Sequence, residues 1–300
     1  MVGEKTKIFL VFGMFVILLL LASLLWTLLT RDKTVDEGQL VAGAGEAGEP
    51  VSTATFEESL ADKANFPSLG PRERNILERH FQAVGGVDRI ASINSVLVTG
   101  EIHYPQGAVQ PIVLVKKSGQ KLRLSIKTGD GQIVMAVTPE NNWRALYQNG
   151  KLRYLDQPKE DEVRRLKRSA YVVSELYMAL NNEWTVRYLG QLAFNYKMAH
   201  CFEVKLNEKD IVRFFINPDT FMDVGREDWY YDADGELTIA RILGSEHIDI
   251  AGLKVPGRIE NYEDNDLKQV FVATDVEINP GILDSSFLQP EIPPEAESTP

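Results

Sequence analysis

From Ser95 onward, apolar and polar residues alternate with a period of two, in short segments separated by turn-forming residues. The clearest segment is 121–127, which reads KLRLSIK. Such alternation is typical of strands that bury one face. The residues between the segments, as at 118–119, 129–131 and 149–150, are of the kind that closes β-hairpins. The pattern predicts a meandering antiparallel sheet of about eleven strands, which must either split or curl.

Two helices are expected beside the strands. The first begins at Pro71, a residue suited to the first helical position, and ends before Gly85 and Gly86. The second spans 160–180, between two groups of strands, and repeats apolar residues at helical spacing. Charged residues crowd its first half. This amphipathic helix is therefore expected to lay an apolar stripe on another element.

Residues 8–29 form an apolar run of twenty-two positions without a charge. At 1.5 Å per residue such a helix is about 33 Å long, enough to cross the roughly 30 Å hydrocarbon core of a bilayer. A removable signal peptide has an apolar stretch of only about 7–15 residues, closely followed by small residues. The best cleavage candidate, at 42–44, lies too far downstream. Residues 1–30 are therefore predicted to be an uncleaved signal anchor that forms a transmembrane helix.

The remaining chain divides into a linker, a domain and a tail. Residues 31–69 are rich in Gly, Ala and acidic side chains, so they are predicted to be a flexible linker. Residues 70–290 are long enough to bury a substantial core, and 291–300 are predicted to be a disordered tail. Three positive groups precede the apolar run and two follow it, which favours a cytoplasmic N-terminus and an exported domain.

Charge and motifs argue against several classes of function. A net charge of −11 without a basic stripe argues against nucleic acid as a partner, and against a domain that clings to anionic head groups. None of the common nucleophile, metalloprotease or phosphate-loop motifs is present, and the four histidines are scattered. The segment 232–236 is too short for a calcium loop, and the single cysteine, Cys201, is predicted to be an inert buried thiol. We therefore expect no enzyme activity, no cofactor and no metal site.

Several predicted strands are rich in large apolar residues, among them 112–115, 133–137 and 214–216. They can form an ordinary packed core between sheet and helices. Alternatively, the inner face of a curled sheet, covered by the helix at 160–180, keeps an apolar cavity. Mouths of incomplete barrels are common ligand sites of roughly 300–1,000 Å³. The residues alone leave both interpretations open.

Several short motifs follow one another in order along residues 72–290. They are 80–86 (HFQAVGG), 93–100, the Asp130-Gly131 turn with Trp143 after it, 218–220 (PDT), 250–256 (IAGLKVP) and 279–290 (NPGILDSSFLQP). In their order and spacing, the chain resembles the periplasmic lipoprotein-carrier superfamily of LolA and LolB. It is most similar to the outer-membrane lipoprotein-sorting-like proteins of that superfamily.

This resemblance implies a mainly β (α+β) fold, a strongly curved antiparallel half-barrel whose hydrophobic inside is covered by helices. It also implies that the ligand is an acyl chain or a lipidated protein. LolA is a free shuttle and LolB is lipid-anchored, whereas this chain carries a predicted membrane span. A linker of about 35 residues reaches roughly 30–35 Å, too little to ferry cargo across a periplasm. The polar groups that latch the LolA lid have no match in this sequence.

The leading hypothesis is a binding protein for a lipid, a lipoprotein acyl chain or another amphiphile. It is expected to be anchored once in the bacterial inner membrane, with its C-terminal domain in the periplasm. The predicted ligand-contacting residues are Trp143, Tyr171, Leu176, Met178 and Trp184 near the mouth, and Leu114, Leu124 and Met135 deeper inside. The alternative hypothesis is an envelope protein-interaction or sensor module with a filled core and no small ligand.

Overall fold

The computed structural model describes residues 69–180, 184–231, 235–263 and 265–291. The predicted signal anchor, the predicted linker as far as residue 68 and the tail from residue 292 lie outside these ranges. Within them, no helix is both long and apolar enough to cross a membrane.

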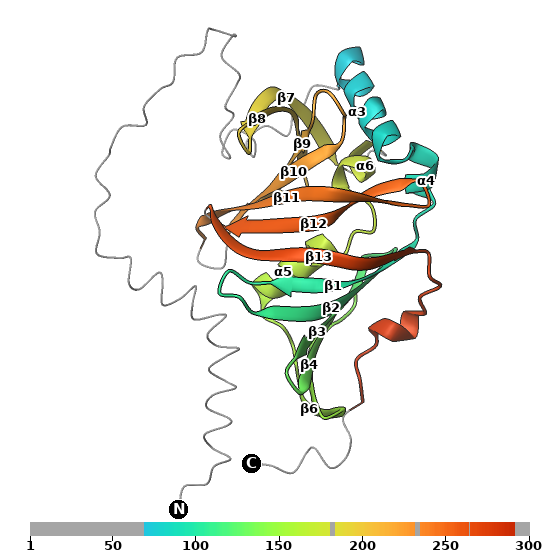
Figure 1. The fold of residues 1–300 in the computed structure, drawn as a ribbon, viewed down its shortest axis with the longest axis vertical. Coiled ribbons are helices and arrows are strands. Elements are labelled where there is room, and N and C mark those ends of the chain that lie inside the picture. Colours follow the sequence, from blue (N-terminus) through green and yellow to red (C-terminus); the bar gives the residue numbers. More distant parts are fainter. Residues whose placement is uncertain (1–68, 181–183, 232–234, 264, 292–300) are drawn as a thin grey trace, which may run out of the picture. The chain divides into compact units, whose positions relative to one another are not determined.

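The strands form one antiparallel sheet of thirteen strands in the order β6-β5-β4-β3-β2-β1-β13-β12-β11-β10-β9-β8-β7 (Figure 1). Their bounds are β1 (Ser95–His103), β2 (Val109–Lys117), β3 (Lys121–Thr128), β4 (Gly131–Val137), β5 (Asn142–Gln148), β6 (Lys151–Asp156), β7 (Thr185–Phe194), β8 (Lys197–Lys205), β9 (Asp210–Ile216), β10 (Asp223–Tyr231), β11 (Leu237–Ile250), β12 (Leu253–Glu263) and β13 (Asp266–Ile278). The meander that the alternation predicts is confirmed. The sheet stays open, because β6 and β7 at its two edges do not pair with each other.

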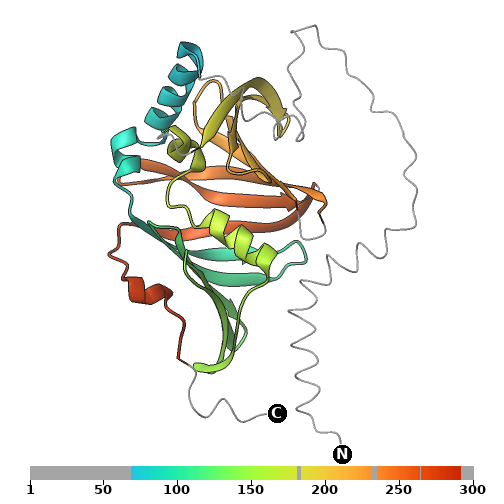
Figure 2. The ribbon, with the colours of Figure 1, turned by 180° about the vertical axis from the view of Figure 1, so that it is seen from behind.

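The chain reaches both edges of the sheet by one crossing. It leads outward from β1 to β6, crosses to the other edge through two helices, and returns from β7 to β13, which pairs with β1. These helices are α5 (Glu160–Ser169) and α6 (Glu175–Leu180), and Figure 2 shows them lying on one face of the sheet. The crossing therefore covers that face, which we call the helix-covered face.

Among the described residues, two further helices precede the sheet and one short helix follows it. They are α3 (Pro71–Val84), α4 (Val87–Ala91) and the 3-10 helix η1 (Asp284–Phe287). Helix α3 begins at Pro71 and ends at Gly85, as the sequence predicts. Gly85 has a φ of 133°, and a Cβ there would lie 2.5 Å from the carbonyl oxygen of Gly252. Glycine is thus required where the end of α3 meets the β11–β12 turn.

The structure corrects two of the predictions. The helix expected at 160–180 is two helices, because the chain leaves the helical path at 170–174. This break contains Val172 and Val173, β-branched residues with reduced helix propensity, and the hydroxyl oxygen of Ser174 accepts a hydrogen bond from the Tyr177 amide to begin α6. The strand count rises to thirteen partly because β6, which follows the 149–150 turn signal, was not predicted as a strand.

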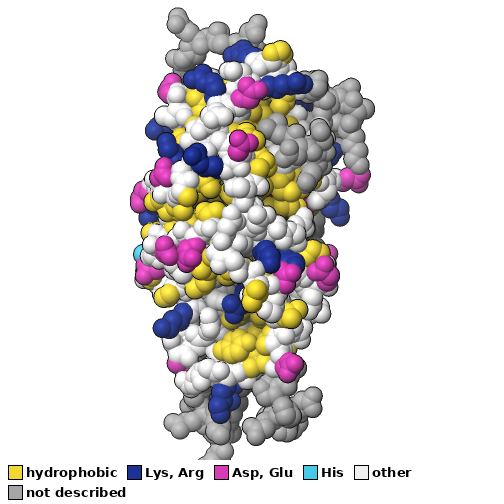
Figure 3. All heavy atoms as spheres, turned by 90° about the vertical axis from the view of Figure 1, so that its right-hand side faces the viewer, with side chains coloured by type: hydrophobic (Ala, Val, Ile, Leu, Met, Phe, Trp, Pro, Cys, Tyr) yellow, Lys and Arg dark blue, Asp and Glu magenta, His cyan; other side chains and the backbone are white. Residues whose placement is uncertain are grey.

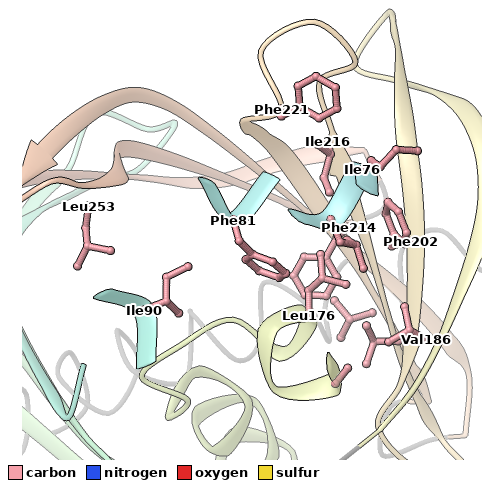
Figure 4. Packing of buried hydrophobic residues seen from close by; sticks show 14 residues of the cluster. Ile76, Phe81, Ile90, Leu176, Val186, Phe202, Phe214, Ile216, Phe221 and Leu253 are labelled. Carbon is pink, nitrogen blue, oxygen red and sulfur yellow. The ribbon is translucent and has the colours of Figure 1, made fainter. Parts of the chain in front are cut away.

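The main hydrophobic core fills the helix-covered face of β7–β9 (Figure 4). Side chains from α3 and α6 meet side chains from the strands there, and Leu77, Phe81, Leu176 and Phe202 are at most 1% exposed. We call this region the filled half. Smaller clusters lie elsewhere. One packs Leu122 and other side chains of β2–β4 under α5, and we call that part of the face the open half.

Candidate functional site

A cavity of about 400 Å³ opens where the α5–α6 connection passes the ends of the strands of the open half. Its walls come from the α4–β1 connection, the β2–β3 and β4–β5 turns, the α5–α6 connection and α6 itself. The lining residues are Ile93, Ser118, Gly119, Gln120, Pro139, Tyr171, Val172, Val173 and Met178. Most of these side chains are apolar, so the site suits a hydrophobic ligand. The side of the molecule drawn in Figure 3 shows apolar side chains gathered in patches between charged ones.

Local backbone geometry brings these walls together. The β2–β3 turn places Gly119 and Gln120 at positive φ angles of 82° and 56°. The side-chain amide of Gln120 donates a hydrogen bond of 2.8 Å to the hydroxyl of Tyr171. The ring of Tyr171 in turn packs edge-on against Trp184, with 5.2 Å between ring centroids. The turn and the helix connection are thereby joined across the mouth of the cavity.

A lysine lies beneath the helix connection. Nζ of Lys116 donates a hydrogen bond of 3.4 Å to the carbonyl oxygen of Tyr171. Burial, together with the nearby guanidinium of Arg226, lowers the pKa of Lys116 from 10.5 to about 8, and Glu175 opposes this shift. Lys116 therefore lies under the wall of the cavity in an environment that disfavours its charged ammonium form.

Lys116 belongs to a cluster of ionic side chains between the sheet and the helices. We call this the inner ion cluster; its members are Lys116, Arg168, Glu175, Asp210, Arg226 and Asp228. Arg226 of β10 lies 3.2 Å from Glu175 of α6 and 3.2 Å from Asp228. Arg168 of α5 pairs with Asp210 and lies 3.7 Å from Asp228. These pairs attach both helices of the crossing to β9 and β10.

The predicted ligand-contacting residues fall into three groups. Tyr171 and Met178 line the cavity, and Trp184 adjoins it through its contact with Tyr171. Leu114, Leu124 and Met135 are paired partners across β2, β3 and β4, so their side chains share one face. Leu114 and Leu124 pack in the cluster under α5 rather than against the cavity.

The other two predicted residues lie outside the cavity. Leu176 is fully buried in the filled half. Trp143 pairs with Ala136, whereas Met135 pairs with Arg144, so Trp143 points to the opposite face of the sheet from Met135. Its indole N–H donates a hydrogen bond of 2.9 Å to the carbonyl oxygen of Phe287, in the segment that follows β13.

Most of the cavity wall was not predicted from the sequence. The residues that were missed are Ile93, Ser118, Gly119, Gln120, Pro139, Val172 and Val173. They lie in turns and connections, where apolar periodicity carries no signal. The hairpin turns themselves were predicted. Turns of successive hairpins that lie at the same end of a sheet form a common rim, and this rule could have pointed to 118–120 and Pro139 together.

Other groups that could take part in chemistry or binding lie away from this cavity. Cys201 is fully buried, and burial raises the pKa of its thiol, which makes it a poor nucleophile. A second cavity of about 310 Å³ lies at the other end of the strands, with Lys127, Asp130 and Tyr147 in its wall. In the part of the chain that the structure describes, no three His, Cys, Asp or Glu side chains are grouped to hold a metal ion.

Comparisons with known proteins give structural similarity alone. No family model and no curated protein matches the chain. A LolA superfamily protein from Nitrosomonas europaea has a TM-score of 0.47 and 13% identity, over 72% of this chain and 97% of that one. An outer membrane lipoprotein-sorting protein domain from Vibrio parahaemolyticus has a TM-score of 0.45 and 11% identity, over 71% and 94%. A DUF1329 family protein from Desulfovibrio piger has a TM-score of 0.45 and 10% identity, over 72% and 96%. These are likenesses to solved structures at low identity, and they say nothing of a ligand.

Proposed function

We propose that this chain binds an acyl chain of a lipid or lipoprotein, or a similar amphiphile, in the cavity beside the α5–α6 connection. The observation that carries the proposal is the apolar wall of that cavity, with Tyr171, Val172 and Val173 on one side and the strand turns on the other. Each methylene removed from water contributes about 0.8 kcal/mol. Affinity can therefore arise there without precise polar contacts.

The size of the cavity favours one chain. A methylene group occupies roughly the volume of a water molecule, about 30 Å³. A cavity of about 400 Å³ therefore accommodates about thirteen methylenes, which is most of a single acyl chain. A lipid with two or three chains would leave the others outside.

We further propose that the domain works in the periplasm while the N-terminal residues hold it at the inner membrane. The support is the uncharged apolar run at 8–29 and the larger number of positive groups before it. The proposal is one of binding without catalysis. No nucleophile and base are positioned together among the residues that line the cavity.

The experiment is native mass spectrometry of a fragment comprising residues 69–291, purified without detergent and then incubated with a single-chain lysophospholipid. A complex of one lipid per chain is expected. Substituting Val172→Trp in the cavity wall should abolish it, whereas the matched control Val109→Trp, at an exposed position of β2, should bind as the unaltered fragment does. A fragment that stays free of lipid, and of acylated peptide, would refute the proposal.

One observation favours the alternative of a protein-interaction or sensor module. The filled half leaves little room for a ligand, because side chains of α3 and α6 occupy the face of β7–β9. A fragment that binds no lipid and co-purifies with a stoichiometric envelope protein would support this second function.

A further inference from the structure

The hairpin between β7 and β8 displays an aromatic side chain that the turn itself does not favour. Its two turn residues, Asn195 and Tyr196, have φ angles of 47° and 63°. A two-residue turn with both φ angles positive strongly prefers Asn-Gly, because a side chain at the second position is strained. Tyr196 nevertheless occupies it and is fully exposed. Strained residues that persist without a packing role point toward function.

Other exposed side chains surround Tyr196. Met198 is 50% exposed and pairs with Ala193, which is also exposed. Lys197 lies between Tyr196 and Met198 in the sequence and is exposed as well. We call Tyr196, Lys197 and Met198 the hairpin tip. An aromatic ring with a polar end, an unbranched apolar chain and a cation are the groups that settle at the boundary between lipid head groups and acyl chains.

The hairpin beneath the tip is firmly held. Phe194, which pairs with Lys197, is 3% exposed and stacks on Phe215 with 4.0 Å between ring centroids. On the other face, the hydroxyl of Tyr188 is 2.8 Å from Nδ1 of His200. The tip is thus presented by a rigid base rather than by a loop.

The hairpin lies beside α3, the first described element after the predicted linker. The ring of His200 stacks on Phe221, and the guanidinium of Arg79 in α3 lies 3.7 Å from the centre of that same ring. Arg72, at the start of α3, helps to lower the pKa of His200, after burial. Figures 1 and 2 both show β7, β8 and α3 at the same end of the molecule.

Charge near this end differs from that of the whole chain. The net charge of the chain is −11, which opposes contact between the domain at large and an anionic membrane. The charges at this end are balanced: Arg72, Arg74, Arg79 and Lys197 are matched by Glu73, Glu78, Asp219 and Asp223. This end can therefore approach phosphate head groups where most of the surface cannot.

We propose that the hairpin tip contacts the lipid bilayer in which the chain is anchored, with Tyr196 and Met198 at the head-group boundary and Lys197 toward lipid phosphates. The inference rests on the proposed membrane anchor, and it is independent of whether the cavity binds a ligand. Contact at this end would orient the domain on the membrane surface, with the β7 edge of the sheet nearer to the lipid than the β6 edge.

The test uses the full chain in vesicles of phosphatidylethanolamine and phosphatidylglycerol. An environment-sensitive fluorophore is attached at Met198→Cys, which leaves Tyr196 in place. The native Cys201 is fully buried and stays unlabelled. The matched control is Asn149→Cys, at an exposed two-residue turn of the β5–β6 hairpin on the opposite edge of the sheet. Lipids with a nitroxide near the head group are then used to quench both probes.

The expected result is quenching at position 198 at least three times that at position 149. Adding Tyr196→Gly should reduce the quenching at 198 to the level at 149, and glycine relieves the turn, so the fold is retained. Equal quenching at 198 and 149 would overturn the proposal, and so would a blue-shifted emission at 198 that lipid nitroxides do not quench, which indicates a protein contact. The proposed anchor is tested separately, by washing the vesicles with alkaline carbonate before the probes are read. A chain that is not anchored would be removed by this wash.

Discussion

The two halves of the helix-covered face both consist of apolar strand residues covered by helices, but they are packed to different degrees. In the filled half, α3 and α6 pack large side chains against β7–β9, and Leu176 is fully buried. In the open half, α5 lies on β3 and β4, and Leu114 and Leu124 are only partly buried beneath it. Close packing of the first half stabilises the fold, while looser packing at the end of the second half leaves the cavity.

The inner ion cluster lies at the boundary between the halves. It joins α5 and α6 to β9 and β10 through Arg168, Glu175 and Arg226. The far end of α5 has a separate attachment, since Arg144 of β5 lies 3.2 Å from Glu162. The helix connection at 170–174, between Arg168 and Glu175 of the cluster, is the part of the crossing that borders the cavity. Any adjustment to a ligand is therefore expected there.

The largest predicted effect is on the free energy of unfolding, and it compares a Leu→Ala substitution in each of the two halves. Leu176→Ala removes a fully buried side chain and is expected to lower the free energy of unfolding by about 3–5 kcal/mol. Leu124→Ala, at a partly buried position of the open half, should cost about 2 kcal/mol or less. Urea denaturation of the 69–291 fragment measures both. Equal losses would mean that the halves are packed alike.

The next effect concerns the inner ion cluster. Glu175 is 2% exposed and its carboxylate lies 3.2 Å from Arg226. Glu175→Ala should cost about 3 kcal/mol, because it leaves a buried guanidinium short of a partner. Glu260→Ala breaks a more exposed pair with Arg258, which has a separation of 3.1 Å, and should cost no more than about 1 kcal/mol. If denaturation gives the same loss for both, the cluster does not hold the crossing.

A third effect follows from pH. In the unfolded chain Lys116 keeps its proton up to a pKa near 10.5, whereas in the fold its pKa is about 8. The unfolded state therefore binds more protons between these values, and stability conferred by this residue rises with pH across that window. Compared with Lys116→Met, the unaltered fragment should gain about 2–3 kcal/mol from pH 8 to pH 10.5. If the difference in free energy of unfolding between the fragment and Lys116→Met stays constant across this range, the Lys116 ammonium is exposed to water in the fold.

The smallest effect on stability should accompany the largest effect on binding. Val172→Trp fills the cavity from a connection that carries no strand pairing, so it should change the free energy of unfolding by less than about 1 kcal/mol. Its affinity for a lysophospholipid should nevertheless fall at least tenfold. Isothermal titration beside Val109→Trp provides the comparison. A variant that unfolds, or one that binds normally, would contradict the assignment of the wall.

The sheet was predictable because alternation and turn chemistry are local. The segment 121–127 could be identified as a strand by itself, and the turn at 149–150 as the end of a hairpin. The face on which Trp143 lies was not predictable, because it depends on the register between β4 and β5, which pairs Trp143 with Ala136. A shift of one residue in that register reverses the face.

The candidate site was harder to predict than the fold. Tyr171 and Met178 were predicted to lie near the mouth of a cavity covered by an amphipathic helix at 160–180, but Tyr171 borders the cavity because that helix breaks at 170–174. Strand alternation predicts the face of the sheet on which Lys116 and Arg226 lie, but it does not predict which element packs on that face. Their pairing with α6 exists only after the chain crosses from β6 to β7. Contacts made by a crossing of this kind leave no periodic signal in the sequence.

The most direct test of a ligand in the cavity is quenching of single tryptophans by a brominated fatty acid. Trp184 adjoins the cavity through Tyr171. Trp143 donates a hydrogen bond to the carbonyl oxygen of Phe287, and Trp229 lies 4.0 Å from the guanidinium of Arg213, both on the face of the sheet opposite the helix-covered one. Three variants of the 69–291 fragment, each retaining one of these tryptophans, would be titrated with the same ligand. Saturable quenching of Trp184 alone is the predicted result. Equal quenching of all three, or none at Trp184, would contradict a ligand in the cavity.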